Sequence, residues 1–402
     1  MSTRRAKVRA VPRAVEGVVV GVTRQSLAAF GAVLWAVQAQ AVILPEERAD
    51  VMYHQYDGGG ITVEGPSVLV RKNYKETVSL SANYYVDNIS SASIDVIASG
   101  ASRYSERREE YSVGAQYLYD KSVLSAGYSN SEESDYNADT YYFNLSQDFF
   151  GDLTTITLGY TLGQDEVFQN GNDEFGEDIE RHNFRIGVTQ ITTPRMIIGL
   201  DYELITDEGF LNNPYRSYRY LIDPLDPTAG FQFAQEVYPD TRTSDAAALR
   251  MRYALSGRRA LGAQYRYFTD DWGIDAHTFE LGYTQVWRDA WTFDIKYRYY
   301  EQTAADFYSD LFTFESQDEN DWRARDKELS EFSNQTLSLY FTYERPLRYF
   351  FFEKTALTVQ WDHIWFDYDN FTDLRVASDV AGEEPTYDFE ADVYKLVFTL
   401  WY

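Results

Sequence analysis

The sequence predicts an all-β fold, a transmembrane up-and-down antiparallel β-barrel of about sixteen strands. Three observations predict it. Apolar and polar side chains alternate with period two from residue 60 to the last residue, without a convincing helical period. Aromatic residues make up 17% of the 402 residues, while cysteine is absent. The connections between the alternating segments are short and long in turn, as in barrels whose two rims differ.

Composition excludes several functions. The formal charge of −27 argues against nucleic acid as a partner, because phosphate binding needs a basic surface. The absence of cysteine excludes disulfides, thiolate metal sites, thiol nucleophiles and covalently attached haem. We therefore expect no cofactor and no nucleic-acid partner.

The first 41 residues have the features of an export signal. A basic segment containing Arg4, Arg5 and Arg13 precedes the apolar run 26–37, and Ala39-Gln40-Ala41 supplies the small residues that signal peptidase reads. We expect cleavage after Ala41, since the apolar run is short for a retained membrane anchor. Loss of six basic residues and one acidic residue would change the formal charge from −27 to −32.

The alternation defines individual strands that have one apolar and one polar face. In the clearest example, Trp291, Phe293 and Ile295 alternate with Asp294 and Lys296. Similar alternation covers residues 196–205, 248–255 and 357–362. Strands of 10–16 residues are longer than those usual in soluble β-sandwiches, which disfavours that alternative.

The connections are expected to be tight at one rim and long at the other. Tight turns are predicted at Asn73–Glu76, Asp120-Lys121, Gly151-Asp152, Thr193-Pro194, Ser256–Arg259 and Arg288–Ala290. Long links are predicted at Ser90–Arg107, Ser131–Ala138, Asp165–Glu177, Asp207–Thr241, Ala305–Glu328 and Asn370–Pro385. Asp270–Gly273 is a short link where a long one is expected.

The number of strands depends on the segment before Thr77. Fourteen strands follow that residue, and Asp50–Asp57 and Ile61–Lys72 add two more around Gly58–Gly60, so that sixteen are predicted. The domain boundaries are then 1–41 for the signal peptide, 42–60 for a first strand or lumenal plug, and 61–402 for the barrel. The alternative is fourteen strands with a lumenal N-terminal segment, in which His54 and Asp57 would plug or gate the barrel.

The C-terminal segment favours a barrel in the outer membrane. Tyr394, Leu396, Phe398, Leu400 and Tyr402 place large apolar side chains on one face. This segment resembles the terminal strand that the barrel assembly machinery recognises, and pairing with the first strand would leave no free edge. Aromatic residues at other strand ends suit the two interfacial girdles, where outer-membrane lipid and lipopolysaccharide are the expected partners.

Several segments resemble one protein family. They are YDGGGITVEGPSVLVRKNY from Tyr56, SQDFFGDLTTITLGY from Ser146, ITDEGFLNNPYRSYRY from Ile205, DDWGIDAHTFELGY from Asp270 and ADVYKLVFTLWY from Ala391. Together they resemble the proteobacterial outer-membrane proteins of domain of unknown function 3570, over nearly all of the expected mature chain. The resemblance implies an exported β-barrel and hints at a redox-linked envelope protein system. It implies no established activity, substrate or catalytic residue.

If Trp291 and its alternating partners face lipid, the intervening charged residues face the lumen. The lumen-lining candidates are Arg250, Arg252, Arg266, Lys296, Arg298, Asp294, Asp201 and Glu203. They form a basic wall beside an acidic strand. The wall either sorts solutes by charge, as charged linings do in channels, or consists of cross-strand ion pairs that neutralise a packed lumen.

Two further groups could carry chemistry. The acidic residues Asp173, Glu174, Glu177 and Asp178 are weak candidates for a divalent cation site, without the spacing of a calcium loop. His277 lies near several carboxylates and could activate water in a barrel hydrolase, although a nucleophile, base and orienting group are not evident together.

The sequence therefore predicts a channel or binding barrel for small polar solutes, without catalytic residues, in the bacterial outer membrane. A structural scaffold or partner of an envelope protein is the alternative, with 207–241 and 305–328 as its contact loops. A hydrolase around His277 is the second alternative.

Overall fold

The computed structural model describes residues 43–91, 104–316, 318, 321–349 and 351–402. The predicted signal peptide 1–41 lies outside the described residues, so the boundary at Ala41 stays a prediction. Among the described residues, no helix has the length and apolar character needed to cross a bilayer.

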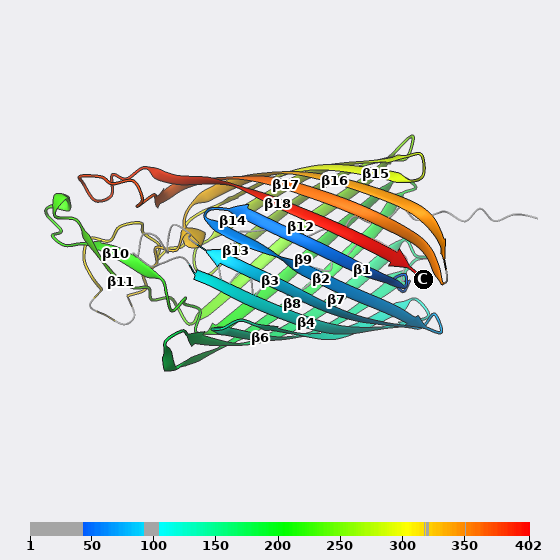
Figure 1. Ribbon diagram of the computed structural model, residues 1–402, viewed down its shortest axis with the longest axis horizontal. Helices are drawn as coiled ribbons and strands as arrows, with labels where there is room; N and C mark the ends of the chain where they lie inside the picture. The colour runs from blue at the N-terminus through cyan, green and yellow to red at the C-terminus, as the bar shows by residue number, and fades with distance from the viewer. Residues whose placement is uncertain (1–42, 92–103, 317, 319–320, 350) are drawn as a thin grey trace, which may run out of the picture.

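Sixteen antiparallel strands form one closed barrel, as the sequence predicts, and two further strands form a separate hairpin (Figure 1). The barrel strands are β1 (Arg48–Gly58), β2 (Ile61–Tyr74), β3 (Val78–Ser91), β4 (Tyr104–Tyr119), β5 (Ser122–Glu132), β6 (Tyr136–Phe149), β7 (Thr154–Gln169), β8 (Asn172–Thr193), β9 (Met196–Gly209), β12 (Thr241–Leu255), β13 (Arg259–Asp270), β14 (Asp275–Trp287), β15 (Trp291–Gln302), β16 (Phe332–Tyr349), β17 (Phe352–Thr372) and β18 (Thr386–Trp401). The hairpin consists of β10 (Ser217–Leu221) and β11 (Phe231–Gln235).

The barrel closes where its first and last strands meet. β1 pairs along its whole length with both β18 and β2, so the segment 42–60 supplies the first strand of the wall. The alternative of fourteen strands with a lumenal N-terminal plug is therefore wrong. Gly59 and Gly60 form the turn between β1 and β2 with positive φ angles of 58° and 79°, a conformation that favours glycine.

The two rims differ in the length of their connections. The predicted long link Ser90–Arg107 lies mostly outside the described residues. The predicted tight turns lie at the end where the chain terminates, which we call the turn end (Figure 1). The links 210–240, 303–331 and 373–385 lie at the opposite end, which we call the loop end.

Two predicted long links are wrong. β5 and β6 are joined by residues 133–135, and β7 and β8 by residues 170–171, because the strands continue through the polar segments that were interpreted as loops. Polar residues alone do not end a strand when the neighbouring strands continue the ladder of hydrogen bonds.

Large apolar side chains cover the outward face of the barrel. Leu200, Leu249, Leu281, Ile295 and Leu396 are all exposed, and each alternates with an inward-facing residue. At the loop-end margin of this surface, tyrosines donate hydrogen bonds to carboxylates, for example Tyr53 to Glu64 at 2.8 Å and Tyr84 to Glu109 at 2.9 Å. Such amphipathic rings suit a membrane interface.

Two clusters of buried apolar residues fill the lumen at the loop end. The first joins the inward faces of β1–β3 and β16–β18, with Ile364, Phe366 and Phe371 at most 3% exposed. The second packs lumen-facing residues of β6–β8 against the links, including Trp272 and Ala324. The long links therefore fold back into the mouth of the barrel, and we call these two clusters the loop-end core.

A network of buried charges holds the long links together above the loop-end core. Arg219 of β10 is fully buried and donates hydrogen bonds to Glu384 Oε1 at 2.8 Å, Thr372 Oγ1 at 2.9 Å and the Asp310 carboxylate. Arg325 also donates to Asp310 Oδ1, at 3.0 Å. These contacts connect all three long links into one folded unit, which we call the cap.

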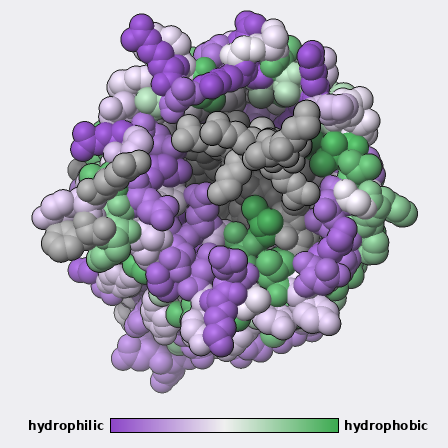
Figure 2. Space-filling view, turned by 90° about the vertical axis from the view of Figure 1, so that its right-hand side faces the viewer, coloured by the Kyte–Doolittle hydropathy of each residue, from purple (hydrophilic) through white to green (hydrophobic). Residues whose placement is uncertain are grey.

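Figure 2 shows the turn end, whose rim carries mostly hydrophilic residues. The polar part of the lumen therefore begins at the turn end, and the loop-end core and the cap lie at its far end. This arrangement positions the charged wall described below.

Candidate functional site: the charged wall of the lumen

All eight predicted lumen-lining residues lie on the inward face. In the registers of β9, β12 and β13, Leu200 pairs with Leu249 and Asp201 pairs with Ala248, which in turn pairs with Arg266. Residues directly opposite each other share a face of the sheet, and Leu200 and Leu249 are exposed on the outside. The same parity on β15 puts Asp294, Lys296 and Arg298 inside.

The structure brings four of these residues together through Arg185 of β8. Arg185 lies 3.4 Å from Asp201 and 3.5 Å from Glu203. Arg250 forms an ion pair with Asp201, and Arg266 lies 3.7 Å from Glu203. Two carboxylates thus neutralise two of three arginines, which matches the interpretation of the wall as cross-strand ion pairs at this level of the lumen.

The residues of β15 are arranged differently. Asp294 accepts a hydrogen bond from Thr284, and the Lys296 ammonium lies 5.2 Å from the ring centroid of Tyr340. Arg298 is directly opposite Glu280 in the register, and its guanidinium lies 5.6 Å from the ring centroid of Tyr300. β15 therefore contributes a second group of charges, separated by β14 from Arg266 of the Asp201 network.

Basic residues exceed acidic residues on the turn-end side of this wall. From Arg185 towards the turn end, the inward positions of β8, β9 and β12–β15 carry six basic and four acidic residues. The basic residues are Arg185, Arg250, Arg252, Arg266, Lys296 and Arg298, and the acidic ones are Asp201, Glu203, Glu280 and Asp294. Arg252 is exposed although it faces inward, so this part of the lumen is open to water.

A second charge ladder, nearer the loop end, was not predicted. Arg181 donates to Asp165 at 2.9 Å and lies 3.6 Å from Asp207, and Arg242 donates to Asp270 at 2.8 Å. Asp207 and Arg242 are directly opposite each other. The period-two alternation of β8 and β9 could have predicted that Arg181 and Asp207 face inward. Asp165 was missed because the segment 165–177 was interpreted as a loop.

The opposite wall contains a buried cluster around His54. His54 Nε2 lies 2.7 Å from Asp87 Oδ1 and 3.0 Å from the hydroxyl of Tyr85. Arg108 lies 3.4 Å from Asp87 and 3.3 Å from Glu110. These charged residues are nearly fully buried in the wall. His54 therefore does not belong to a plug, and the cluster links β1, β3 and β4.

The weak divalent-cation candidates do not form a site. Asp173, Glu174, Glu177 and Asp178 lie along β8, where successive side chains point to opposite faces. Among the described residues, no group of three or more histidine, aspartate or glutamate side chains could hold a metal ion. The prediction failed because it assumed a loop that could fold around an ion.

His277 lies on the outward face, away from the lumen. It is directly opposite Tyr267 and Glu301, and its Nδ1 lies 2.8 Å from the hydroxyl of Tyr265. Its ring packs within the aromatic residues Tyr265 and Tyr267. This position is that of an interfacial girdle residue, and the structure gives the hydrolase hypothesis no support.

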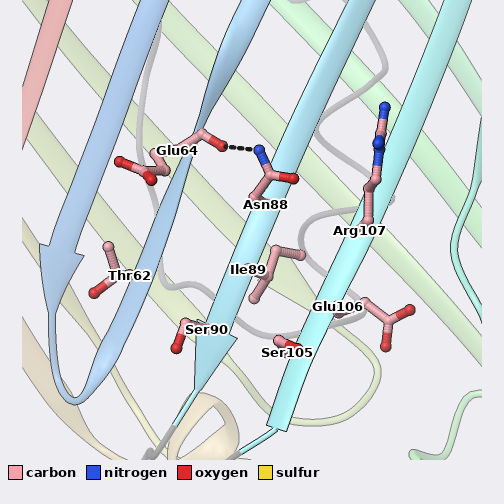
Figure 3. Close-up of a pocket in the computed structure, with 8 residues that line it drawn as sticks. All are labelled: Thr62, Glu64, Asn88, Ile89, Ser90, Ser105, Glu106 and Arg107. Carbon is pink, nitrogen blue, oxygen red and sulfur yellow. Dashed lines mark hydrogen bonds between the residues drawn. The ribbon is translucent and has the colours of Figure 1, made fainter.

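A small pocket of about 380 Å³ lies at the loop-end rim of β2, β3 and β4 (Figure 3). Glu64, Asn88 and Arg107 line it, and Asn88 Nδ2 donates to the carbonyl of Glu64 at 3.3 Å. These strands lie across the barrel from the charged wall. The pocket is therefore separate from the candidate site.

The cap carries one carboxyl group with an unusual protonation behaviour. Glu236 is 2% exposed, and burial together with the nearby Asp326 carboxylate raises its pKa to about 7. The Tyr238 hydroxyl donates to Glu236 at 2.6 Å, while Arg216 forms an ion pair with Asp326. Two carboxylates thus share one nearby guanidinium in a dry environment, which favours the neutral form of Glu236.

Comparison with solved structures finds barrels of low identity. A bacterial polysaccharide outer membrane secretin has 8% identity and a TM-score of 0.47, with 89% of this chain and 100% of that chain covered. A Pseudomonas aeruginosa FadL homologue has 11% identity and a TM-score of 0.41, with 89% and 90% covered. The CymD monoaromatic hydrocarbon channel has 9% identity and a TM-score of 0.40, with 89% of both chains covered. These scores are below 0.5, so nothing about this chain is inferred from them.

Comparison with curated proteins finds no match. The comparison with protein families finds one, described as Protein of unknown function (DUF3570), over residues 167–347. These residues run from the loop end of β7 into β16 and include the whole charged wall from Arg185 to Arg298. This is the family that the sequence segments resemble, and the family model matches residues 167–347 of the chain.

Proposed function

We propose that the protein is an outer-membrane channel or binding barrel for small polar solutes, with its turn end in the periplasm and its cap outside. Short periplasmic turns and long outer loops are the usual arrangement of such barrels. The charged wall is the observation that carries the proposal, because Arg252 faces inward and is exposed to water, and charged linings sort solutes in channels.

The cap acts as a gate in this proposal. The loop-end core contains lumen-facing residues of β6–β8 and of β16–β18. Solutes that enter from the turn end therefore meet a packed outer mouth. Passage then requires the links to move, and Arg219 is the residue that ties all three links together. Loosening of the cap should therefore increase passage.

Single-channel current through the refolded protein in a planar bilayer tests this proposal. We expect brief openings for the wild type, a preference for anions under a salt gradient, and a larger open fraction for Arg219→Met. The matched control is Arg375→Met, because Arg375 is a partly exposed cap residue whose ion pair is local. A folded barrel that passes no current in the wild type and in Arg219→Met would refute passage.

One observation favours the alternative of an envelope scaffold. The cap exposes large apolar side chains, among them Leu225, Phe314 and Trp322 at 94%, 56% and 48%. Isolated exposed apolar residues are common, but a folded outer unit that presents several of them is also suited to protein contact. Photo-crosslinking from position 225 in intact cells would identify a partner, and a barrel that is silent in bilayers but crosslinks specifically would favour this function.

A further inference from the structure

The small hairpin of the cap has strand edges, whereas the barrel wall has none. The barrel strands close into a ring, and β10 and β11 form a separate two-stranded sheet at the loop end (Figure 1). A strand edge carries main-chain N–H and C=O groups that can pair with a strand of another chain. The two edges of the hairpin therefore decide whether the cap can accept a further strand.

The edge of β10 is already covered by another link. Phe312 donates its main-chain N–H to the carbonyl of Arg219 at 2.9 Å, and Leu221 donates to the carbonyl of Phe312 at 3.0 Å. These bonds also show which main-chain groups of β10 point away from β11. They belong to the odd-numbered residues of β10, so the even-numbered residues pair with β11.

The edge of β11 is free among the described residues. Ile222 donates to the carbonyl of Gly230 at 3.1 Å, which continues the ladder beyond its last pair. Because hydrogen-bonded pairs alternate along an antiparallel ladder, the main-chain groups of Phe231, Phe233 and Gln235 point away from β10. In the part of the chain that the structure describes, no residue pairs with these outward groups.

β11 also lacks the features that usually protect a free edge. Its residues Phe231–Gln235 include no proline and no charged side chain, and they pair with β10 without a bulge. Proteins usually block an edge by such features or by a covering segment, as Phe312 covers β10. Phe233 and Gln235 are exposed. The edge of β11 is therefore open to strand addition, in which main-chain hydrogen bonds supply the affinity.

The two faces of the sheet differ beside this edge. Phe231 and Phe233 share one face, with ring centroids 5.5 Å apart, and offer an apolar surface. Gln232 lies on the other face and accepts a hydrogen bond from the Tyr220 hydroxyl at 3.0 Å. Desolvation and the nearby Glu315 carboxylate raise the pKa of that hydroxyl, so this face has an acidic neighbour. An added strand that alternates apolar and basic residues matches both faces.

The exposed surface of the cap is acidic. Exposed carboxylates in the described parts of the three links include Asp223, Asp226 and Glu315, whereas Arg375 is the one exposed basic residue there. Arg375 is itself paired with Asp373, at 2.7 Å. The other basic residues of these links are buried or partly buried. A surface of this charge attracts a cationic partner and repels a second copy of the same cap.

We propose that β11 binds an extended cationic peptide segment of a partner protein, which pairs with Phe231–Gln235 as a third strand of the hairpin. The added strand places apolar side chains beside Phe231 and Phe233, and basic side chains on the face near Glu315. This interaction goes beyond solute passage, because it uses the outer surface of the cap and needs no open lumen.

Fluorescence anisotropy of a labelled peptide with the refolded full-length barrel in detergent measures this binding. The probe alternates lysine and valine over seven residues, and the matched comparison alternates glutamate and valine. We expect the lysine peptide to bind at least about tenfold more tightly than the glutamate peptide, and to bind more weakly as salt is added. A third probe is the lysine peptide with a methylated main chain, which keeps its charges but removes its hydrogen-bond donors. It should bind at least about tenfold more weakly.

Two variants separate the strand edge from its side chain. Phe233→Pro removes an outward N–H that β10 does not use, so the hairpin should stay paired. Binding of the lysine peptide should weaken by about tenfold or more, because the ring removes a donor and blocks close approach of the added strand. Phe233→Ala keeps the main-chain edge and should weaken binding less than Phe233→Pro.

Three further variants test the charge. Asp226→Asn and Glu315→Gln should each weaken binding of the lysine peptide by about twofold or more, because each removes a negative charge from the cap. Glu76→Gln is the matched control, since it removes the same charge from an exposed turn at the opposite end of the barrel. It should leave binding unchanged.

Hydrogen exchange shows where the peptide binds. The lysine peptide should slow exchange at residues 231–235 in the wild type but not in Phe233→Pro. Exchange of β10 without peptide should be equal in both proteins, which checks that the hairpin is intact. If Phe233→Pro loses the hairpin, the methylated peptide still tests strand addition, because it leaves the protein unchanged.

Three results would overturn the proposal. One is equal binding of the lysine peptide and the methylated peptide, or equal binding by the wild type and an intact Phe233→Pro hairpin. Another is equal binding of the glutamate peptide. The third is slow exchange at 231–235 that appears without peptide as the barrel concentration rises, which would identify a second copy as the occupant. A barrel that conducts but binds no peptide would overturn this docking and leave passage in place.

Discussion

The two ends of the lumen use arginine in opposite ways. At the loop end, Arg219 is fully buried and donates to Asp310, Thr372 and Glu384 at once. Towards the turn end, Arg252 faces the same lumen but is exposed to water beside Gly262. The former fixes the positions of three links, and the latter is placed where a solute can reach it.

This difference shows what burial does to a charge. A guanidinium without water must have its hydrogen bonds supplied by the protein, so its partners are fixed and it contributes to structure. A guanidinium in a wet lumen keeps its charge at little cost and can exchange water for a ligand. The sign of the charge is the same, and the local water content decides its role.

The largest expected effect comes from breaking the loop-end network. Arg219→Met would leave the buried Glu384 carboxylate without its cation and Asp310 with Arg325 alone, and breaking such a buried pair costs about 3–5 kcal/mol. Hydrogen exchange of the links 210–240, 303–331 and 373–385 should accelerate while the barrel strands stay protected. Unchanged exchange in these links would mean that the network does not hold the cap.

The next effect is a dependence of cap stability on pH. Burial raises the pKa of Glu236 from its usual value of 4.5 to about 7. Between these two pH values, Glu236 is protonated in the folded cap but ionised in the unfolded links. Cap stability should therefore fall as the pH rises from about 4.5 to about 7, by at most about 3 kcal/mol, and level off above it.

Limited proteolysis of the cap at pH 5 and pH 8 measures this dependence. Cleavage should be faster at pH 8 in the wild type. Glu236→Gln, which keeps the group neutral at both pH values, should remove most of the difference. If cleavage of the Glu236→Gln cap kept the full pH dependence, a group other than Glu236 would be its cause.

A smaller effect is expected at the turn end. Arg252→Glu reverses one exposed charge in the lumen and should lower the ratio of anion to cation permeability by about threefold or more, with little change in stability. Reversal potentials in a salt gradient measure the ratio. Arg195→Glu makes the same change of charge in a turn outside the wall, and an equal effect from both variants would point to surface charge instead.

The smallest effect is expected at an exposed ion pair of the turn end. Arg258 and Asp289 lie in neighbouring turns with side chains that are 60% and 62% exposed. Arg258→Gln should change the free energy of unfolding by less than about 0.5 kcal/mol, because exposed pairs are screened by water and salt. Urea unfolding of the refolded barrel gives this value, and a loss above about 1 kcal/mol would contradict the contrast between buried and exposed charges.

The sequence predicted much of the wall and little of the cap. The inward positions of Asp201, Arg250 and Lys296 followed from period-two alternation, because the pleat of a strand fixes the face of each side chain locally. The same rule would have found Arg185, which alternates with outward-facing Phe184 and Ile186. Arg181 and Asp165 were missed because their polar neighbours were interpreted as a loop.

By itself, the sequence determined the barrel, the closure of its last strand against its first strand, the turn end and the charge of the lumen wall. These features follow from alternation and turn residues, which act over a few positions along the chain. Only the tertiary structure decided which arginines are buried. Arg219 meets Asp310 and Glu384, which are 91 and 165 residues away, and that meeting depends on how three links fold back together. The free edge of β11 likewise depends on how the links fold, because Phe312 covers the edge of β10 and leaves that of β11 open.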